Sequence, residues 1–259
     1  MKCIVCVTSV PDTASVIKIS GDGTHIDETG IKWIISPYDE YALEEALKIT
    51  EARGGEVTAV TYGPTRAEAT LRDCLARGAH QAIHILGGEA TLGDSLTIAK
   101  VLAAALTGRG YDLILCGYKG VGTDCSQVGQ MLAELLGIPH VSNVTKLTVG
   151  DGSIEAGRDV EGGQEQVHCP LPALITAQKG LNEPRYAALK GIMAAKKKPV
   201  EKIEVASLGI NEGADTFFTI HKLELPAATT AGTIIHGEED PQAAAAQLVK
   251  LLRDEAKAI

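Results

Sequence analysis

Aromatic residues are scarce in this sequence: phenylalanine, tryptophan and tyrosine together make up 3% of the 259 residues. Proteins that bind single-stranded nucleic acid use aromatic rings as stacking platforms for the bases, so the scarcity argues against that role. Basic residues are also outnumbered, 24 against 33 acidic ones, which gives a formal net charge of −9. A chain with this charge is repelled by phosphate backbones and by anionic membranes. We therefore expect no nucleic-acid partner.

Long hydrophobic runs are absent as well. No apolar run is long enough to span a bilayer, so no transmembrane segment is expected. The first residues, M-K-C-I-V-C-V-T-S-V-P-D, have too short an apolar core for a signal peptide and reach Pro11 and Asp12 at once. They predict a buried strand, and the sequence predicts a protein of the reducing cytoplasm.

The sequence also lacks a convincing metal site. Its six cysteines lie mostly inside apolar runs, as small buried side chains do. Cys3 and Cys6 form a C-x-x-C string, but residues three apart on a strand face opposite sides of the sheet. His80 and His84 have the spacing of a helical metal pair, yet they straddle a predicted turn and strand. We predict no metal site.

What the sequence does contain is an alternation of strands and helices over residues 1–137. Strands are predicted at 2–8, 57–62, 81–86 and 113–116, and an amphipathic helix follows each. Ser36, Pro37, Tyr38 and Asp39 form a strong helix start, with serine as N-cap and Asp39 completing a capping box. Asp94 is a second predicted N-cap. The alternation predicts an α/β fold with a largely parallel sheet and right-handed crossovers.

After Pro139 the pattern changes. Short β segments at 144–149, 153–158, 166–168 and 173–176 are separated by glycine pairs, and antiparallel hairpins added to one sheet edge are the simplest interpretation. Residues 178–199 look like a loop, and residues 200–259 like an extension with little core of its own. We predict an α/β nucleotide-binding domain over 1–199 and a C-terminal arm over 200–259 that packs on a partner.

The fold is organised around residues 111–139, a strand, a glycine loop and a helix. Val128, Met131 and Leu135 mark the apolar face of that helix, and Gly137 stands where a left-handed C-terminal residue belongs. Asp124 and Ser126 are predicted to cap the start of the helix. Free N–H groups at a helix N-terminus bind anions, so the loop predicts a phosphate cradle at the carboxyl edge of the sheet. An ordinary tight turn remains the structural alternative.

Three strings together resemble the β (small) subunit of electron-transfer flavoproteins. They are S-P-Y-D-E-Y-A-L-E-E-A-L at 36–47, D-C-S-Q-V-G-Q-M-L-A at 124–133 and L-N-E-P-R-Y-A-A-L-K-G-I-M-A-A-K-K-K-P at 181–199. The resemblance implies a Rossmann-like, adenine-nucleotide α-hydrolase-like fold in a heterodimer. The α subunit would hold a redox FAD between the chains, and this chain would carry a buried AMP. Electrons would arrive from acyl-CoA or related dehydrogenases and leave to a quinone reductase, which makes the protein an electron carrier and not an enzyme.

The resemblance also assigns residues. The family's dehydrogenase-docking loop falls on 178–199, with Leu189 as its anchor and with Arg185 and Tyr186 beside it. Asp159 matches an acidic residue that pairs with the α subunit near the flavin. The nucleotide contacts of the family fall on Cys6, Ser36, Pro37, Tyr38, Asp39, Tyr62, Gly117, Gly120, Gly122, Thr123, Asp124, Cys125, Ser126, Gln127 and Val128.

Some members of this family bind a second FAD in place of AMP and split electron pairs between two acceptors. Val128 and the V-P-D string ending at Asp12 match those members, whereas Cys125 and Gln130 match the AMP-binding ones. Thr13 stands where the family often has an aromatic residue near the flavin. We expect AMP, with a second FAD as the alternative.

Two interpretations from other classes remain. An adenylating enzyme of similar build needs a serine- and glycine-rich loop directly after the first strand, and the segment from Thr8 to Asp12 has none. A stand-alone adenine-nucleotide-sensing module would explain residues 1–137 but assigns no role to residues 181–199 or to the C-terminal arm.

Overall fold

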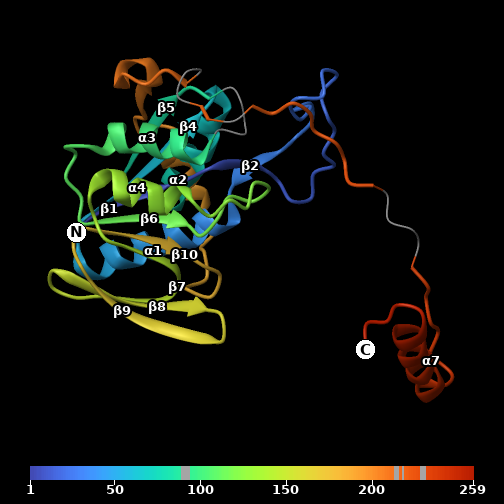
Figure 1. Cartoon of the computed structure of the whole chain (residues 1–259). Helices are drawn as coiled ribbons and strands as arrows, with labels where there is room; N and C mark the ends of the chain where they lie inside the picture. Colours follow the sequence, from blue (N-terminus) through green and yellow to red (C-terminus); the bar gives the residue numbers. More distant parts are fainter. Residues whose placement is uncertain (89–93, 213–215, 218, 228–231) are drawn as a thin grey trace. The chain divides into compact units, whose positions relative to one another are not determined.

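A largely parallel sheet forms the centre of the fold (Figure 1). The computed structural model describes residues 1–88, 94–212, 216–217, 219–227 and 232–259, and within these ranges nine strands pair in the order β11-β5-β4-β1-β6-β10-β7-β8-β9. All neighbours from β11 to β7 are parallel, whereas β7, β8 and β9 form an antiparallel meander at one edge. The predicted fold class is confirmed. The strands are β1 (Lys2–Cys6), β4 (Glu56–Gly63), β5 (Gln81–Leu86), β6 (Leu113–Gly117), β7 (His140–Val149), β8 (Ser153–Val160), β9 (Gly163–Pro170), β10 (Ala173–Ala177) and β11 (Glu201–Glu204).

Helices cover both faces of this sheet and enclose two hydrophobic cores. Because side chains alternate along a strand, Cys3 and Val5 of β1 join the core beneath one set of helices, and Ile4 and Cys6 join the other. The C-x-x-C string therefore points to opposite faces, as predicted. The first set is α1 (Pro37–Arg53), α2 (Glu68–Arg77) and α5 (Leu189–Ala195), and the second is α3 (Ser95–Leu106) and α4 (Val128–Leu136).

Two predicted helix ends are confirmed. Asp94 caps α3, and its carboxylate accepts a hydrogen bond from Leu96 N at 3.1 Å. Gly137 ends α4 in the left-handed conformation.

The predicted start of α1 is confirmed, with Ser36 at the N-cap position and Pro37 as the first helical residue, but the capping bonds predicted for α1 and the cap residues predicted for α4 were wrong. Ser36 occupies the N-cap position of α1, but its hydroxyl makes no capping bond, and Asp39 bonds elsewhere. At α4 the N-cap residue is Gln127, because Asp124 and Ser126 adopt positive φ angles of 49° and 52° that turn the loop before the helix. Tertiary contacts thus replace the local capping pattern in α1, and loop geometry replaces it in α4.

Two segments after Pro139 also differ from expectation. The sequence pattern predicts strand β10 as part of an edge hairpin, but it lies inside the sheet, parallel to β6 on one side and to β7 on the other. All five of its residues are buried, as an interior parallel strand requires. The predicted loop at 178–199 contains helix α5, which begins at Leu189.

A small antiparallel pair stands apart from the main sheet. It consists of β2 (Ser9–Pro11) and β3 (Trp33–Ile35), and a single bridge between Ile19 and Ile26 closes the excursion between them. Short 3₁₀ turns follow β4 and β11, namely η1 (Thr65–Ala67) and η2 (Val205–Leu208).

The chain divides into two units, Met1–Leu223 and Glu224–Ile259. The division falls later than residue 199, the boundary expected from the sequence, because β11 pairs with β5 and belongs to the sheet. The second unit contains α7 (Pro241–Asp254), which Asp240 caps through bonds from Gln242 N and Ala243 N. Within the described ranges, no helix is both long and apolar enough to cross a membrane.

Candidate functional site

The carboxyl ends of β1, β4 and β6 border a cavity of about 190 Å³. Adjacent parallel strands end at the same edge of a sheet, and ligands of open α/β sheets bind there. Helix α3 contributes Ser95, Ile98 and Leu102 to the wall, and the start of α4 closes the cavity on another side. The strand ends and the loops after them supply Cys6, Val7, Thr8, Ser9, Tyr62, Gly63, Cys116 and Gly117.

Asp39 ties two of these strand ends together. Its buried carboxylate accepts hydrogen bonds from Thr8 N at 2.7 Å and from Gly117 N at 2.9 Å. Burial raises the pKa of Asp39 to about 7. Only glycine fits at 117, since a Cβ there would lie 2.3 Å from Asp39 Oδ1. Asp39 therefore fixes the chain after β1 and the end of β6 at the edge of the cavity.

The loop from Gly117 to Val128 has the geometry of an anion site. The first hydrogen bond of α4 runs from Met131 N to Gln127 O at 3.0 Å, so the N–H groups before Met131 have no partner within the helix. Gln127 and Val128 carry this helix start into the cavity lining. A phosphate group at this position would accept bonds from the free amides and interact favourably with the helix dipole.

Two cations also line the cavity: Lys119 lies within the predicted nucleotide loop from Gly117 to Val128, whereas Arg66 was not predicted. Lys119 donates to Asp124 at 2.9 Å, and this bond raises the pKa of Lys119. Arg66 lies over the Trp33 ring at 3.9 Å and pairs with Glu28 at 2.9 Å, while burial lowers the pKa of Arg66. Arg66 could have been found from its position just after β4, at the same edge as Tyr62.

Neutral polar groups complete the lining. The hydroxyl of Ser9 is buried without a hydrogen-bond partner in the described chain, which leaves it free for a bound molecule. Tyr62 donates to Glu212, whose carboxylate also accepts from Gly88 N at 2.5 Å. Burial and this carboxylate raise the pKa of Tyr62, so its hydroxyl stays protonated.

Cys6 and Cys116 face each other across β1 and β6 and both line the cavity. A hydrogen bond with Cys6, together with burial, raises the pKa of Cys116. A protonated thiol is a poor nucleophile and a poor metal ligand. Among the described residues, no group of three or more His, Cys, Asp or Glu side chains could hold a metal ion.

The structure brings most of the predicted nucleotide contacts into one lining. Ser36, Pro37, Tyr38, Gly122 and Asp124 lie outside it. Tyr38, Gly122 and Asp124 directly precede or follow a lining residue in the chain, and Ser36 N donates to Thr8 O of the lining at 2.9 Å. The predicted residues that line the cavity are Cys6, Asp39, Tyr62, Gly117, Gly120, Thr123, Cys125, Ser126, Gln127 and Val128.

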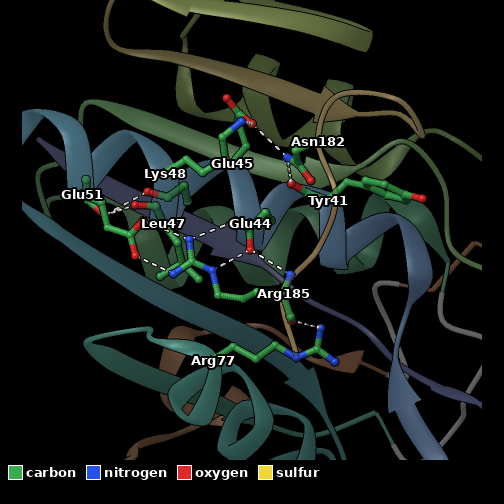
Figure 2. A network of polar contacts seen from close by, with 11 residues as sticks. Tyr41, Glu44, Glu45, Leu47, Lys48, Glu51, Arg77, Asn182 and Arg185 are labelled. Atoms are coloured by element: carbon green, nitrogen blue, oxygen red, sulfur yellow. Dashed lines mark hydrogen bonds and ion pairs between the residues drawn. The ribbon is translucent and has the colours of Figure 1, made fainter. Parts of the chain in front are cut away.

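The residues predicted to contact partners lie elsewhere. Tyr186 and Leu189 are strongly exposed, at 92% and 76%. Arg185 instead binds two glutamates of α1 (Figure 2). Asp159 lies on β8, where its carboxylate accepts from Gln164 Nε2 at 2.8 Å and Thr145 Oγ1 at 3.3 Å.

Comparison with known proteins identifies the family. The profile described as "Electron transfer flavoprotein domain" matches residues 23–208 of this chain. The chain belongs to the electron transfer flavoprotein family. Three relatives named "Electron transfer flavoprotein subunit beta" support the assignment, and each alignment spans at least 90% of both proteins. That of Bacillus subtilis is 45% identical over 90% of this chain and 91% of its own length. The subunit of Syntrophomonas wolfei is 36% identical over 99% of this chain and 98% of its own length. The subunit of Bos taurus is 35% identical over 93% of this chain and 94% of its own length.

Among members of the electron transfer flavoprotein family, this chain is thus similar to the β subunits along almost its whole length. The alignment with the Syntrophomonas wolfei subunit covers 258 residues, so it includes residues 181–199 and the C-terminal unit. A nucleotide-sensing module confined to the first 137 residues would give no reason for residues 181–199 and the C-terminal unit to resemble those of a β subunit.

Proposed function

We propose that this chain is the β subunit of a heterodimeric electron-transfer flavoprotein and that its cavity holds AMP. The α subunit holds most of the redox FAD, and the assembled dimer carries electrons from acyl-CoA or related dehydrogenases to a quinone reductase. The similarity to β subunits over the whole chain supports the assignment most strongly. In this role the chain is a carrier, since no step of bond making or breaking is assigned to its own residues.

The cavity fits a nucleotide with a single phosphate. Free amides at the start of α4 and the ammonium group of Lys119 provide donors and positive charge for the phosphate. The unpartnered hydroxyl of Ser9 and the guanidinium of Arg66 are available to other polar groups of the ligand. These features support AMP as a bound structural ligand.

The size of the cavity favours AMP over a second FAD. Its volume is about 190 Å³, which is small for either ligand, so the smaller of the two needs less rearrangement of the lining. A dinucleotide with a three-ring flavin needs more room than a nucleoside monophosphate. Val128 in the lining is the residue that matches the electron-splitting members, so a second FAD is the alternative to test.

FAD, when held between the subunits, supplies the group that accepts and releases electrons. The part of this chain is to position that group and to receive the dehydrogenase. Tyr186, Leu189 and Met193 expose 92%, 76% and 64% of their surfaces and are the most exposed large apolar side chains of residues 178–199. Exposed apolar side chains on an ordered segment are suited to anchoring a partner protein. Asp159 on β8 is our candidate for the contact with the α subunit near FAD.

The nucleotide content of the purified heterodimer tests this proposal. The protein is denatured, and the released nucleotides are separated and counted. One FAD and one AMP per dimer is the expected result, whereas two FAD and no AMP would make the protein electron-splitting.

A variant locates the AMP site within the chain. Gly117→Ala places a Cβ against Asp39 and the backbone of Tyr38, and we expect the heterodimer to lose AMP while keeping FAD. Gly150→Ala is the matched control, because a Cβ there meets only ordinary contacts at 3.5 Å or more. Full AMP content in Gly117→Ala would place the nucleotide elsewhere.

A further inference from the structure

Arg185 lies between two carboxylates of helix α1 (Figure 2). Its Nε and Nη2 donate to Glu44 at 2.8 and 3.0 Å, and its Nη1 and Nη2 donate to Glu51 at 2.5 and 3.0 Å. The backbone N–H of Arg185 adds a bond to Glu44 at 3.1 Å. Glu44 and Glu51 are seven residues apart, about two helical turns, so both carboxylates lie on one face of α1. Each of two edges of the planar guanidinium therefore meets one carboxylate.

The burial of the three side chains shows which contact is indispensable. The Glu44 side chain is 8% exposed, that of Arg185 33% and that of Glu51 57%. A carboxylate as buried as Glu44 needs a hydrogen-bonded cation, whereas a pair as exposed as Glu51 with Arg185 contributes less. The hydrogen bond from Arg185 nevertheless lowers the pKa of Glu51.

Further polar contacts fix the same short segment. Asn182 Nδ2 donates to Tyr41 O at 3.0 Å and to Glu45 at 2.9 Å, both on α1. Arg77 of α2 donates to Arg185 O at 3.3 Å. Residues 182–185 are thereby held by side chains of two helices.

The chain is held again after helix α5. Arg72 of α2 donates to Ala195 O at 3.0 Å and to Lys198 O at 2.6 Å, and Lys198 Nζ donates to Ala79 O at 2.6 Å. The strongly exposed apolar residues Tyr186, Leu189 and Met193 lie between the two attachments. Both ends of this apolar stretch are therefore anchored to the body of the protein.

We propose that Glu44, Arg185 and Glu51 form a clamp that fixes residues 182–185 on α1 and so orients Tyr186 and Leu189 before a dehydrogenase arrives. Arg185 is then a positioning residue and not a direct partner contact. This inference rests on the docking role proposed above. Ordering a segment before association removes that cost from the binding step, so the clamp raises affinity without touching the partner.

Arginine is required at this position by the geometry. Two carboxylates each receive two N–H bonds from the guanidinium, which a planar fork of donors can supply. A lysine carries the same charge but presents its donors from one point, so it cannot pair with both carboxylates in this way.

The test uses the complete heterodimer with Arg185→Gln, Arg185→Lys and the double variant Arg185→Gln/Glu44→Gln. The double variant removes the guanidinium without leaving a buried carboxylate unpaired, so its fold is protected. We expect amide hydrogen exchange in residues 182–195 to rise at least tenfold in all three. With an acyl-CoA dehydrogenase, reduced by its own substrate, as electron donor, we expect KM for the flavoprotein to rise about tenfold at unchanged kcat.

Two further variants serve as references. Arg109→Gln removes a comparable two-point pair, from Arg109 to Glu201 at 2.6 and 3.0 Å, and should leave exchange in residues 182–195 and KM as in the parent. Leu189→Ala should raise KM without changing exchange at 182–185, because it alters the docking side chain and not the clamp.

The outcomes separate the clamp from the docking role. The clamp would be overturned if amide exchange in the double variant were the same as in the parent. It would also be overturned if both amide exchange and KM in Arg185→Lys were the same as in the parent. Either result would count against the clamp even if Leu189→Ala impairs electron transfer. Unchanged transfer in Leu189→Ala would overturn the docking role, while the exchange measurement, which needs no dehydrogenase, still decides the clamp.

Discussion

Asp39 shows how a single residue can serve the whole site. The sequence places it in the first turn of α1, where an acidic residue commonly bonds to its own helix. The fold instead directs its carboxylate across the helix start to the amides of Thr8 and Gly117. One side chain therefore joins α1, β1 and β6 at the edge where the nucleotide is proposed to bind.

We predict that Asp39→Asn destabilises the protein, most strongly at acidic pH. The amide nitrogen of asparagine cannot accept, so one of the two N–H groups loses its partner at a cost of about 1–3 kcal/mol. The pKa of Asp39, about 7, is above that of an unfolded aspartate, so the parent binds more protons when folded and loses stability as pH rises from about 4 to about 7. Asparagine does not ionise, so the variant does not lose stability in this way as pH rises.

Urea denaturation of the parent and variant heterodimers at pH 5 and pH 8 checks the prediction. The free energy of unfolding of the parent should exceed that of Asp39→Asn by more at pH 5 than at pH 8, and the two differences should themselves differ by more than about 1 kcal/mol. Asp112→Asn is the control, since its carboxylate also accepts a strand amide, from Lys2 N at 2.7 Å, but at the surface. An equal difference at both pH values would show that Asp39 does not titrate in this range.

At the scale of elements, the contact between α5 and α2 depends on one glycine. An added Cβ at Gly191 would lie 2.2 Å from the backbone oxygen of Ala76, so the two helices approach closely at this point. The close contact places α5 against α2 and leaves Leu189 and Met193 on the exposed side. A glycine inside a helix is unfavourable by itself, which indicates that packing decided its use here.

We predict that Gly191→Ala displaces α5 and lowers the melting temperature. The clash involves backbone atoms of α2 that cannot move aside, and overpacking of this kind costs about 1–3 kcal/mol. The gain in helix propensity, about 1 kcal/mol, is smaller. Differential scanning calorimetry of the heterodimer measures the shift. Gly21→Ala, where an added Cβ meets nothing within 4 Å, should leave the melting temperature unchanged; a more stable Gly191→Ala would disprove the close contact.

At the scale of the whole molecule, the two units differ in how much they bury. Among the described residues, the buried hydrophobic ones belong to Met1–Leu223, whereas the unit Glu224–Ile259, taken by itself, encloses no core. Leu248 and Val249 of α7 are 48% and 43% exposed. An amphipathic helix whose own unit encloses no core gains stability when its apolar face is buried on another surface, and we take the α subunit to provide that surface.

We predict that a chain ending at Leu223 stays folded but assembles poorly with the α subunit. Its cores are complete without the second unit, so cooperative thermal unfolding should persist. The affinity for the α subunit, measured by calorimetric titration, should fall at least tenfold, which corresponds to about 1.4 kcal/mol. Leu248→Ser should reproduce part of this loss and Gln247→Ser none of it. Full affinity of the shortened chain would falsify the arm's role in assembly.

The sequence by itself determined the alternation of strands and helices, because the apolar periodicity and the Asp94 and Gly137 helix ends are local features. It also located the glycine loop that follows β6, since a strand, glycines and a helix start are adjacent in the chain. Strand β10 was misplaced because its pairing with β6 and β7 is long-range, and short buried strands carry no signal of their neighbours.

Only the tertiary structure decided which side chains act together. Asp39, Thr8 and Gly117 come from three separate segments, and so do Arg66, Lys119 and Ser9 of the cavity. The resemblance of its segment to a docking loop predicts a partner contact for Arg185, and only the structure shows that its guanidinium binds Glu44 and Glu51, more than a hundred residues away. Such contacts depend on how α1 packs beside residues 178–199, and local sequence carries no record of that packing.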